Sequence, residues 1–246
     1  MKTGNLVYLD NNVSCNGHFA YDESTSAPTP GVLVVHEAFG LGAHAMERAE
    51  SLAELGYVAL AVDMFGGRRQ AKDLSEAMTL MGQLSPAEIR SRITAGLHAL
   101  LGMPHVDSTR VGAIGFCFGG STVLELARSG ANVGGVVSFH GALTARAPID
   151  GPIKAKILVC HGADDPMVTS DQMTAFQTEM RQAKADWQVN IHGNAVHSFT
   201  NREAAHAGVP GLNYNEPADR RSWAAMQYFF TEIFGTNGVR MASHHA

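Results

Sequence analysis

The chain has 246 residues, which is enough to bury one α/β core but short for two independent domains. Hydrophobic residues make up 45% of it, which excludes disordered and fibrous classes. The formal net charge of -5 argues against an electrostatic surface for nucleic acid, so no nucleic-acid partner is expected. We therefore expect one domain that spans residues 1–246.

Hydropathy and cysteine usage bear on the compartment. No stretch approaches the roughly 20 consecutive apolar residues of a membrane span, and residues 1–5 lack the apolar core of a signal peptide. The three cysteines, Cys15, Cys117 and Cys160, are odd in number and too sparse for a disulfide framework. We expect a cytoplasmic protein with no membrane partner.

Short apolar runs alternate with helical segments along the chain. Runs typical of buried parallel strands occupy residues 31–36, 57–62, 110–115, 133–139 and 156–161, and a last strand is expected at residues 187–192. Helices are expected over residues 45–55, 85–101, 121–128 and 216–234. This alternation is typical of βαβ units. It predicts a single-domain α/β fold with a mostly parallel central sheet and helices on both faces.

Local signals refine this pattern. Ser85, Pro86 and Glu88 form a capping box with proline at the first helical position, which marks the start of one helix. Two long segments, residues 65–84 and 197–215, have no regular pattern. Loops of this length inside a compact domain are more often functional than accidental, and α/β folds place ligand-facing loops after strand ends.

The most specific local motif is Gly-Phe-Cys-Phe-Gly-Gly at residues 115–120. It follows an expected strand and precedes an expected helix, which is the context of the G-x-S-x-G nucleophile elbow, with Cys117 in place of serine. The glycines permit a tight turn, and the N-terminus of the helix favours a thiolate. Taken alone, the motif also fits a buried structural cysteine beside a glycine-rich turn.

Two later segments supply the other members of a possible triad. Triads of this fold follow the order nucleophile, acid, histidine. Asp164 and Asp165 follow the strand expected at residues 156–161, and His197 follows the last expected strand. Either aspartate could orient the histidine from a turn, so these positions alone leave both open.

Together these motifs resemble the dienelactone hydrolase family. The resemblance rests on Glu37 after the first long strand, the cysteine elbow, Asp-Asp-Pro and Val-His-Ser-Phe, and it covers about residues 31–234. It implies an α/β-hydrolase fold and cleavage of an ester or lactone bond, as in carboxymethylenebutenolidase. The family triad falls on Cys117, Asp165 and His197, which favours Asp165 over its neighbour.

The resemblance also assigns the surroundings of the nucleophile. Glu37 matches the family glutamate that controls the ionisation of the cysteine. The oxyanion hole would consist of the backbone N–H groups of Ala38 and Phe118. The family reaction needs no cofactor, because thiol, imidazole and carboxylate supply the chemistry. The expected partner is a small-molecule ester or lactone.

The match departs from the family at the substrate-binding arginines. The founding activity opens a lactone whose carboxylate is held by two arginines. At those places this chain has Gly67, followed by Arg68 and Arg69, and Asn201, followed by Arg202. Arginine forks suit carboxylates. We therefore expect Arg68, Arg69 and Arg202 to rim the pocket and to bind an anionic group of the substrate.

Other functions were weighed against this one. His36 and Glu37 resemble the start of a zinc-protease motif, but the second histidine of H-E-x-x-H is absent, so no metal is expected. A thioesterase or a general carboxylesterase could use the same triad. A non-catalytic small-molecule binder is the alternative of another class, and it would not need all three triad residues.

Overall fold

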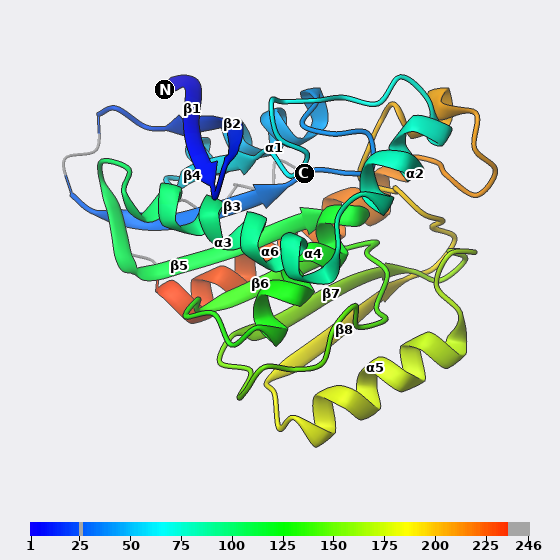
Figure 1. Cartoon of the computed structure of the whole chain (residues 1–246). Coiled ribbons are helices and arrows are strands. Elements are labelled where there is room, and N and C mark those ends of the chain that lie inside the picture. Colours follow the sequence, from blue (N-terminus) through cyan, green and yellow to red (C-terminus); the bar gives the residue numbers. More distant parts are fainter. Residues whose placement is uncertain (25–26, 236–246) are drawn as a thin grey trace.

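Eight strands form one sheet in the order β1-β2-β4-β3-β5-β6-β7-β8 in the computed structural model, which describes residues 1–24 and 27–235 (Figure 1). The strands are β1 (Lys2–Asp10), β2 (Val13–Tyr21), β3 (Thr29–Val35), β4 (Val58–Val62), β5 (Val106–Phe116), β6 (Gly135–Phe139), β7 (Lys156–Gly162) and β8 (Trp187–His192). Strands β3 to β8 pair in parallel, whereas β1 and β2 add an antiparallel hairpin at one edge. The predicted mostly parallel sheet is confirmed.

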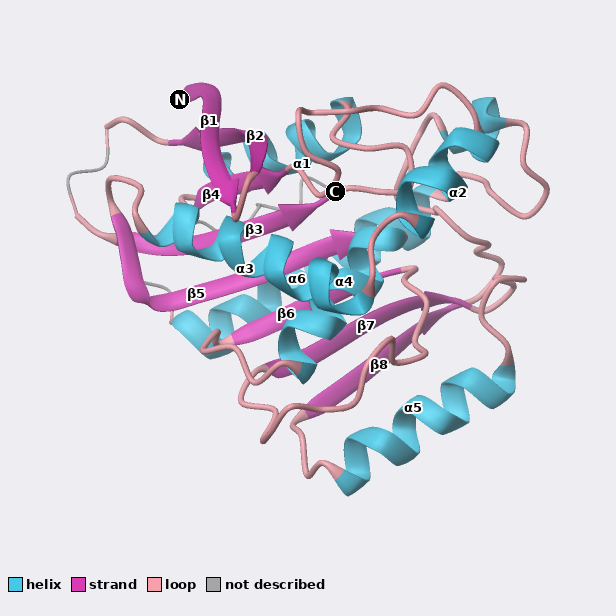
Figure 2. Cartoon of the chain, in the orientation of Figure 1, coloured by secondary structure: helices cyan, strands magenta, loops and turns pink. Residues whose placement is uncertain are grey.

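Helices cover both faces of this sheet, as predicted (Figure 2). They are α1 (Ala43–Glu54), α2 (Leu74–Gly82), α3 (Pro86–Leu101), α4 (Phe118–Arg128), α5 (Ser170–Gln182) and α6 (Glu216–Phe234), with a short 3-10 helix, η1 (Ala204–Ala207). None of the helices in the described part of the chain has the length and hydropathy to cross a membrane.

The hydrophobic core is divided by the sheet into two clusters. Leu33 and Val35 of β3 pack in one cluster with α3, α4 and α5, whereas Val32 and Val34 pack in the other with α1 and α6. All four side chains are fully buried, because a central parallel strand is covered on both faces. This explains why β3 is a continuous apolar run and not an alternating one.

Five elements were not predicted from the sequence: β1, β2, α2, α5 and η1. Helix α2 lies in the segment 65–84 and η1 in the segment 197–215, both of which we expected to be irregular. The start of α2 is capped by Asp73, whose carboxylate accepts the N–H of Glu76 at 2.9 Å. Its apolar residues, at positions 74, 77, 78, 80 and 81, form one wide stripe at helical spacing. The sequence therefore carried a helical signal here that our prediction missed.

Candidate active site

Cys117 lies in the sharp turn between β5 and α4, at φ 54° and ψ -113°. Neighbouring backbone atoms leave no room for a side chain at Gly115 or Gly119, the glycines on either side of Cys117. A Cβ on Gly115 would lie 2.0 Å from the carbonyl oxygen of Gly119, and one on Gly119 would lie 2.2 Å from that of Val35. Positive φ is rare for a residue with a side chain and marks a strained position. The local structure is therefore the predicted nucleophile elbow.

His197 and Asp165 meet at the same edge of the sheet. Nδ1 of His197 is 2.8 Å from Oδ2 of Asp165, and both side chains are almost fully buried. The other carboxylate oxygen, Oδ1, accepts the backbone N–H of Met167 at 2.8 Å. Asp164 is exposed. Of the two candidates, the structure brings Asp165 to His197.

The proton affinity of His197 follows from these neighbours. Burial lowers its pKa, but the hydrogen bond to Asp165 and the adjacent Cys117 outweigh burial and raise the pKa to about 10. Nε2 of the ring is buried and has no hydrogen-bond partner among the described residues. Since Asp165 holds Nδ1, Nε2 is the ring atom that is available for proton transfer at Cys117.

A second buried histidine, His140, holds the backbone of Cys117. The N–H of Cys117 donates to Nδ1 of His140 at 3.1 Å and to the carbonyl oxygen of Phe139 at 3.0 Å. Nε2 of His140 is 2.8 Å from Oγ1 of Thr200. Burial and the neighbouring His197 hold the pKa of His140 well below its usual value, so its ring is neutral and Nδ1 can accept.

His140 was missed by the sequence analysis. Its signal is its position directly after β6, at the edge of the sheet where the triad candidates also lie. The rings of His140 and His197 are in edge-on contact, with centroids 5.3 Å apart. The two histidines therefore sit in one cluster but differ in their proton affinity.

Glu37 follows β3 and faces two polar partners that sequence reasoning also missed. The side-chain amide of Asn201 donates to its Oε2, and Nδ1 of His44 lies 3.5 Å from the same oxygen. Burial raises the pKa of Glu37, but His44 and other neighbours outweigh it and lower the pKa to about 2. Glu37 is thus ionised near neutral pH. Its Oε1 has no hydrogen-bond partner among the described residues.

The site opens into a cavity of about 620 Å³. Its wall includes Cys117, His197 and Glu37, together with Ala38 from the predicted oxyanion hole. Phe118, the other predicted member, begins α4 directly after the nucleophile. Both long segments that we expected to face a ligand contribute to the wall, through α2 and through residues 197–212.

The structure does not bring the three predicted arginines to this cavity. None of them belongs to its lining. Arg68 donates to Asn5 and Met46, at 2.7 Å in each case. Arg69 donates to the carbonyl oxygen of Phe65, and Arg202 lies over the ring of Tyr214 at 5.9 Å. The expected arginine rim is absent among the described residues that line the cavity.

Buried Asp63 explains the course of the segment that carries two of these arginines. Its Oδ1 accepts the N–H of Gly66 at 2.9 Å, and its Oδ2 accepts the N–H of Arg68 at 2.6 Å. The carboxylate thus fixes a tight turn directly after β4. The turn directs the guanidinium groups to partners outside the cavity.

The remaining cysteines have no catalytic surroundings. Cys15 and Cys160 are fully buried in opposite halves of the core, and burial raises the pKa of each thiol, that of Cys15 to about 11. Cys117 is partly exposed and faces the cavity. Within residues 1–24 and 27–235, no group of three or more His, Cys, Asp or Glu side chains is placed to hold a metal ion.

Comparison with known proteins agrees with the motifs. The dienelactone hydrolase family model matches residues 18–234. A Synechocystis protein named "Putative carboxymethylenebutenolidase" is 30% identical, over 95% of this chain and 98% of its own. The crystal structure of a dienelactone hydrolase-like promiscuous phosphotriesterase from metagenomic libraries is 47% identical, with a TM-score of 0.90 over 95% of this chain and 99% of that one. The chain therefore belongs to the dienelactone hydrolase family and is a hydrolase that acts on ester or lactone bonds.

Proposed function

We propose that the protein cleaves its ester or lactone substrate with Cys117 as nucleophile, His197 as general base and Asp165 as the residue that orients His197. One observation carries this proposal. Asp165 bonds Nδ1 of His197 at 2.8 Å, and Nε2 is left without a partner in the cavity wall that also contains Cys117. These contacts support the proposal, because acyl transfer by a thiol needs a base that an acid orients beside the nucleophile.

The proposed reaction has two halves. In the first, the Sγ proton of Cys117 passes to Nε2 of His197 and Sγ attacks the carbonyl carbon. The N–H groups of Ala38 and Phe118 stabilise the oxyanion. Its collapse breaks the bond to the alcohol oxygen, which takes the proton from His197, and an acyl thioester remains. In the second half, His197 takes a proton from water and hydroxide attacks the thioester carbon. Collapse breaks the bond to Sγ, the acid leaves, and Sγ takes the proton back from His197, which restores the thiol.

Glu37 is proposed to tune the nucleophile. Its carboxylate is held on one side by Asn201, and its Oε1 is free of partners among the described residues. An unpaired carboxylate oxygen in the cavity wall can accept the thiol hydrogen of the resting enzyme. This role accounts for a buried ionised carboxylate that makes no salt bridge with arginine or lysine in the described structure.

The test is turnover of a chromogenic short-chain ester, p-nitrophenyl butanoate, before and after thiol alkylation. Cys117→Ala should abolish turnover, and alkylation should inactivate the wild type. The matched controls Cys15→Ala and Cys160→Ala should keep kcat/KM within about tenfold, because both thiols lie in the core away from the cavity. Undiminished turnover by Cys117→Ala would exclude the proposed nucleophile.

A second candidate activity is cleavage of neutral phosphotriesters. It is favoured by the 47% identity to a promiscuous phosphotriesterase of the same family. A thioesterase or general carboxylesterase reaction would use the same three residues. Parallel assays with an aryl phosphotriester, a thioester and a carboxylic ester would rank these activities. Each activity should disappear in Cys117→Ala if it uses the proposed triad. Family membership leaves the non-catalytic binder without support.

A further inference from the structure

The cavity has one polar wall and one apolar wall. The polar wall holds the proposed catalytic groups. The apolar wall is the set of large apolar side chains in the lining, which come from four parts of the chain. They are Phe39, Leu74, Met78, Met81, Met167, Val209 and Leu212. A mostly apolar wall with a few convergent polar groups is typical of small-molecule sites, and the thioethers adapt to ligands of irregular shape.

Helix α2 contributes the largest share of this wall from a single face. Leu74, Met78 and Met81 are spaced i, i+4 and i+7, so they project from the same side of the helix. Ala77 and Leu80 are the buried core residues of the same apolar stripe, and Met81 also packs against the core. The stripe extends past the core to Leu74 and Met78, which line the cavity, so it is wider than packing in the core requires.

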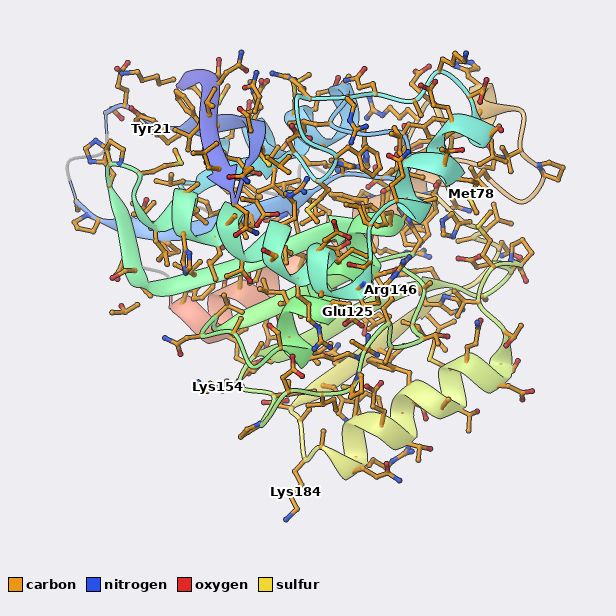
Figure 3. All side chains as sticks on the ribbon, viewed as in Figure 1. Tyr21, Met78, Glu125, Arg146, Lys154 and Lys184 are labelled. Carbon is orange, nitrogen blue, oxygen red and sulfur yellow. The ribbon has the colours of Figure 1, made fainter. Side chains whose placement is uncertain are left out.

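Leu74 and Met78 of α2, and Met167 outside that helix, have largely exposed side chains. Leu74 is 42%, Met78 59% and Met167 44% exposed, although all three line the cavity. Met78 lies on α2 at the rim of the molecule (Figure 3). Exposed apolar side chains that converge on one cavity mark a binding surface for an apolar group.

The charges around the cavity disfavour an anion. Its lining contains no lysine or arginine in the described structure, and it contains the carboxylates Glu37 and Glu203. Glu37 is ionised, because its pKa is lowered to about 2. Protonated His197 is paired with Asp165 and is needed at the proposed nucleophile. A substrate carboxylate elsewhere in the cavity would lose its hydration without a lysine or arginine partner and near the like charge of Glu37, which is costly.

We propose that the natural substrate is a neutral ester or lactone with a bulky apolar group that packs on Leu74, Met78 and Met81. This rests on the proposed function, because it assigns a substrate class to the same site. It replaces the anionic substrate that the sequence led us to expect, since the three arginines bind elsewhere.

The experiment uses p-nitrophenyl esters that differ in one property at a time. Acetate, butanoate and hexanoate vary acyl length, and each added methylene should raise kcat/KM about three- to fourfold if it is buried. Hexanoate and the monoester of adipic acid have equal length, but the second ends in a carboxylate. The neutral ester should be preferred by a factor on the order of a hundred or more.

A substituted protein tests whether the proposed wall makes this choice. Met78→Arg places a cation at the rim and should lower the neutral-to-anionic ratio about tenfold. Val7→Arg is the matched control, because Val7 of β1 is 64% exposed and does not line the cavity. Its ratio should equal that of the wild type.

The outcomes separate the two proposals. Equal or better cleavage of the anionic ester by the wild type, or no gain with acyl length, would overturn the substrate class and leave the triad standing. An equal change of the ratio in Met78→Arg and Val7→Arg would also overturn it. Absence of turnover on every ester would overturn the proposed function, and the substrate class with it.

Discussion

The backbone N–H of Cys117 donates to Nδ1 of His140 at 3.1 Å. The same N–H also points at the carbonyl oxygen of Phe139, 3.0 Å away, so two acceptors fix the strained turn. His140 is itself fixed by Thr200. A buried neutral histidine thus holds the backbone of the proposed nucleophile, while its neighbour His197 is the proposed base for the Cys117 side chain.

Removal of the His140 acceptor should lower kcat more than it alters KM. We expect His140→Ala to lower kcat about ten- to a hundredfold, because misplacement of a reacting atom by a fraction of an ångström is costly. His140→Asn keeps an acceptor oxygen near the place of Nδ1 and tolerates the positive φ of this position, so it should retain more activity. Steady-state kinetics on one neutral ester decides this; an unchanged kcat in folded His140→Ala would refute the positioning role.

The two neighbouring aspartates form a matched pair. Asp165→Asn should lower kcat by about a thousandfold or more, because the histidine loses the acceptor that sets its tautomer and orientation. Asp164→Asn should change kcat by less than about threefold, since that side chain is exposed. A larger loss in Asp164→Asn than in Asp165→Asn would show that the acid has been misassigned.

The free energy of unfolding can test whether steric contacts require glycine at position 119. Gly119→Ala should destabilise the fold by about 3 kcal/mol or more, because its Cβ would lie 2.2 Å from the carbonyl oxygen of Val35. Gly82→Ala is the control: Gly82 ends α2, and a Cβ there has no atom within 4 Å. That change should be neutral or stabilise by up to about 1 kcal/mol. Urea unfolding measures both, and equal effects would contradict the steric account.

The raised pKa of His197 predicts a pH-dependent contribution to stability. A folded-state pKa of about 10 lies above the usual 6.5, so the contribution is complete below pH 6.5 and is lost as the pH rises towards 10. Each unit of difference corresponds to about 1.4 kcal/mol. The difference in unfolding free energy between wild type and His197→Gln should therefore shrink over this range. A difference that stays constant or grows would show that His197 does not bind its proton more tightly in the folded protein.

The sequence contained enough information for the parallel sheet and for the proposal of a triad. The inner parallel strands β3, β4 and β6 are almost wholly apolar and buried, and the glycines around Cys117 are dictated by backbone contacts as close as 2.0 Å. Such features are local in the chain. The order of Cys117, Asp165 and His197 after successive strands follows from the topology, in which the carboxyl ends of parallel strands share one edge.

Other parts could not be predicted, because they depend on contacts between distant segments. Asn201 reaches Glu37 across 164 positions of the chain, and Thr200 reaches His140 across 60. The positions of the arginines could not be predicted for a similar reason. Arg68 is placed by the turn at Asp63 and by its hydrogen bond to Asn5, which is distant in the chain. No periodicity or motif reports such contacts.

The most direct test of the account is to identify the acylated residue. Wild-type protein is mixed with excess p-nitrophenyl hexanoate, quenched with acid during turnover, digested and analysed by mass spectrometry. The account predicts one acyl group on the peptide that contains Cys117, attached as a thioester and released by neutral hydroxylamine. An acyl group on another residue, or continuing turnover without acylated Cys117, would contradict it.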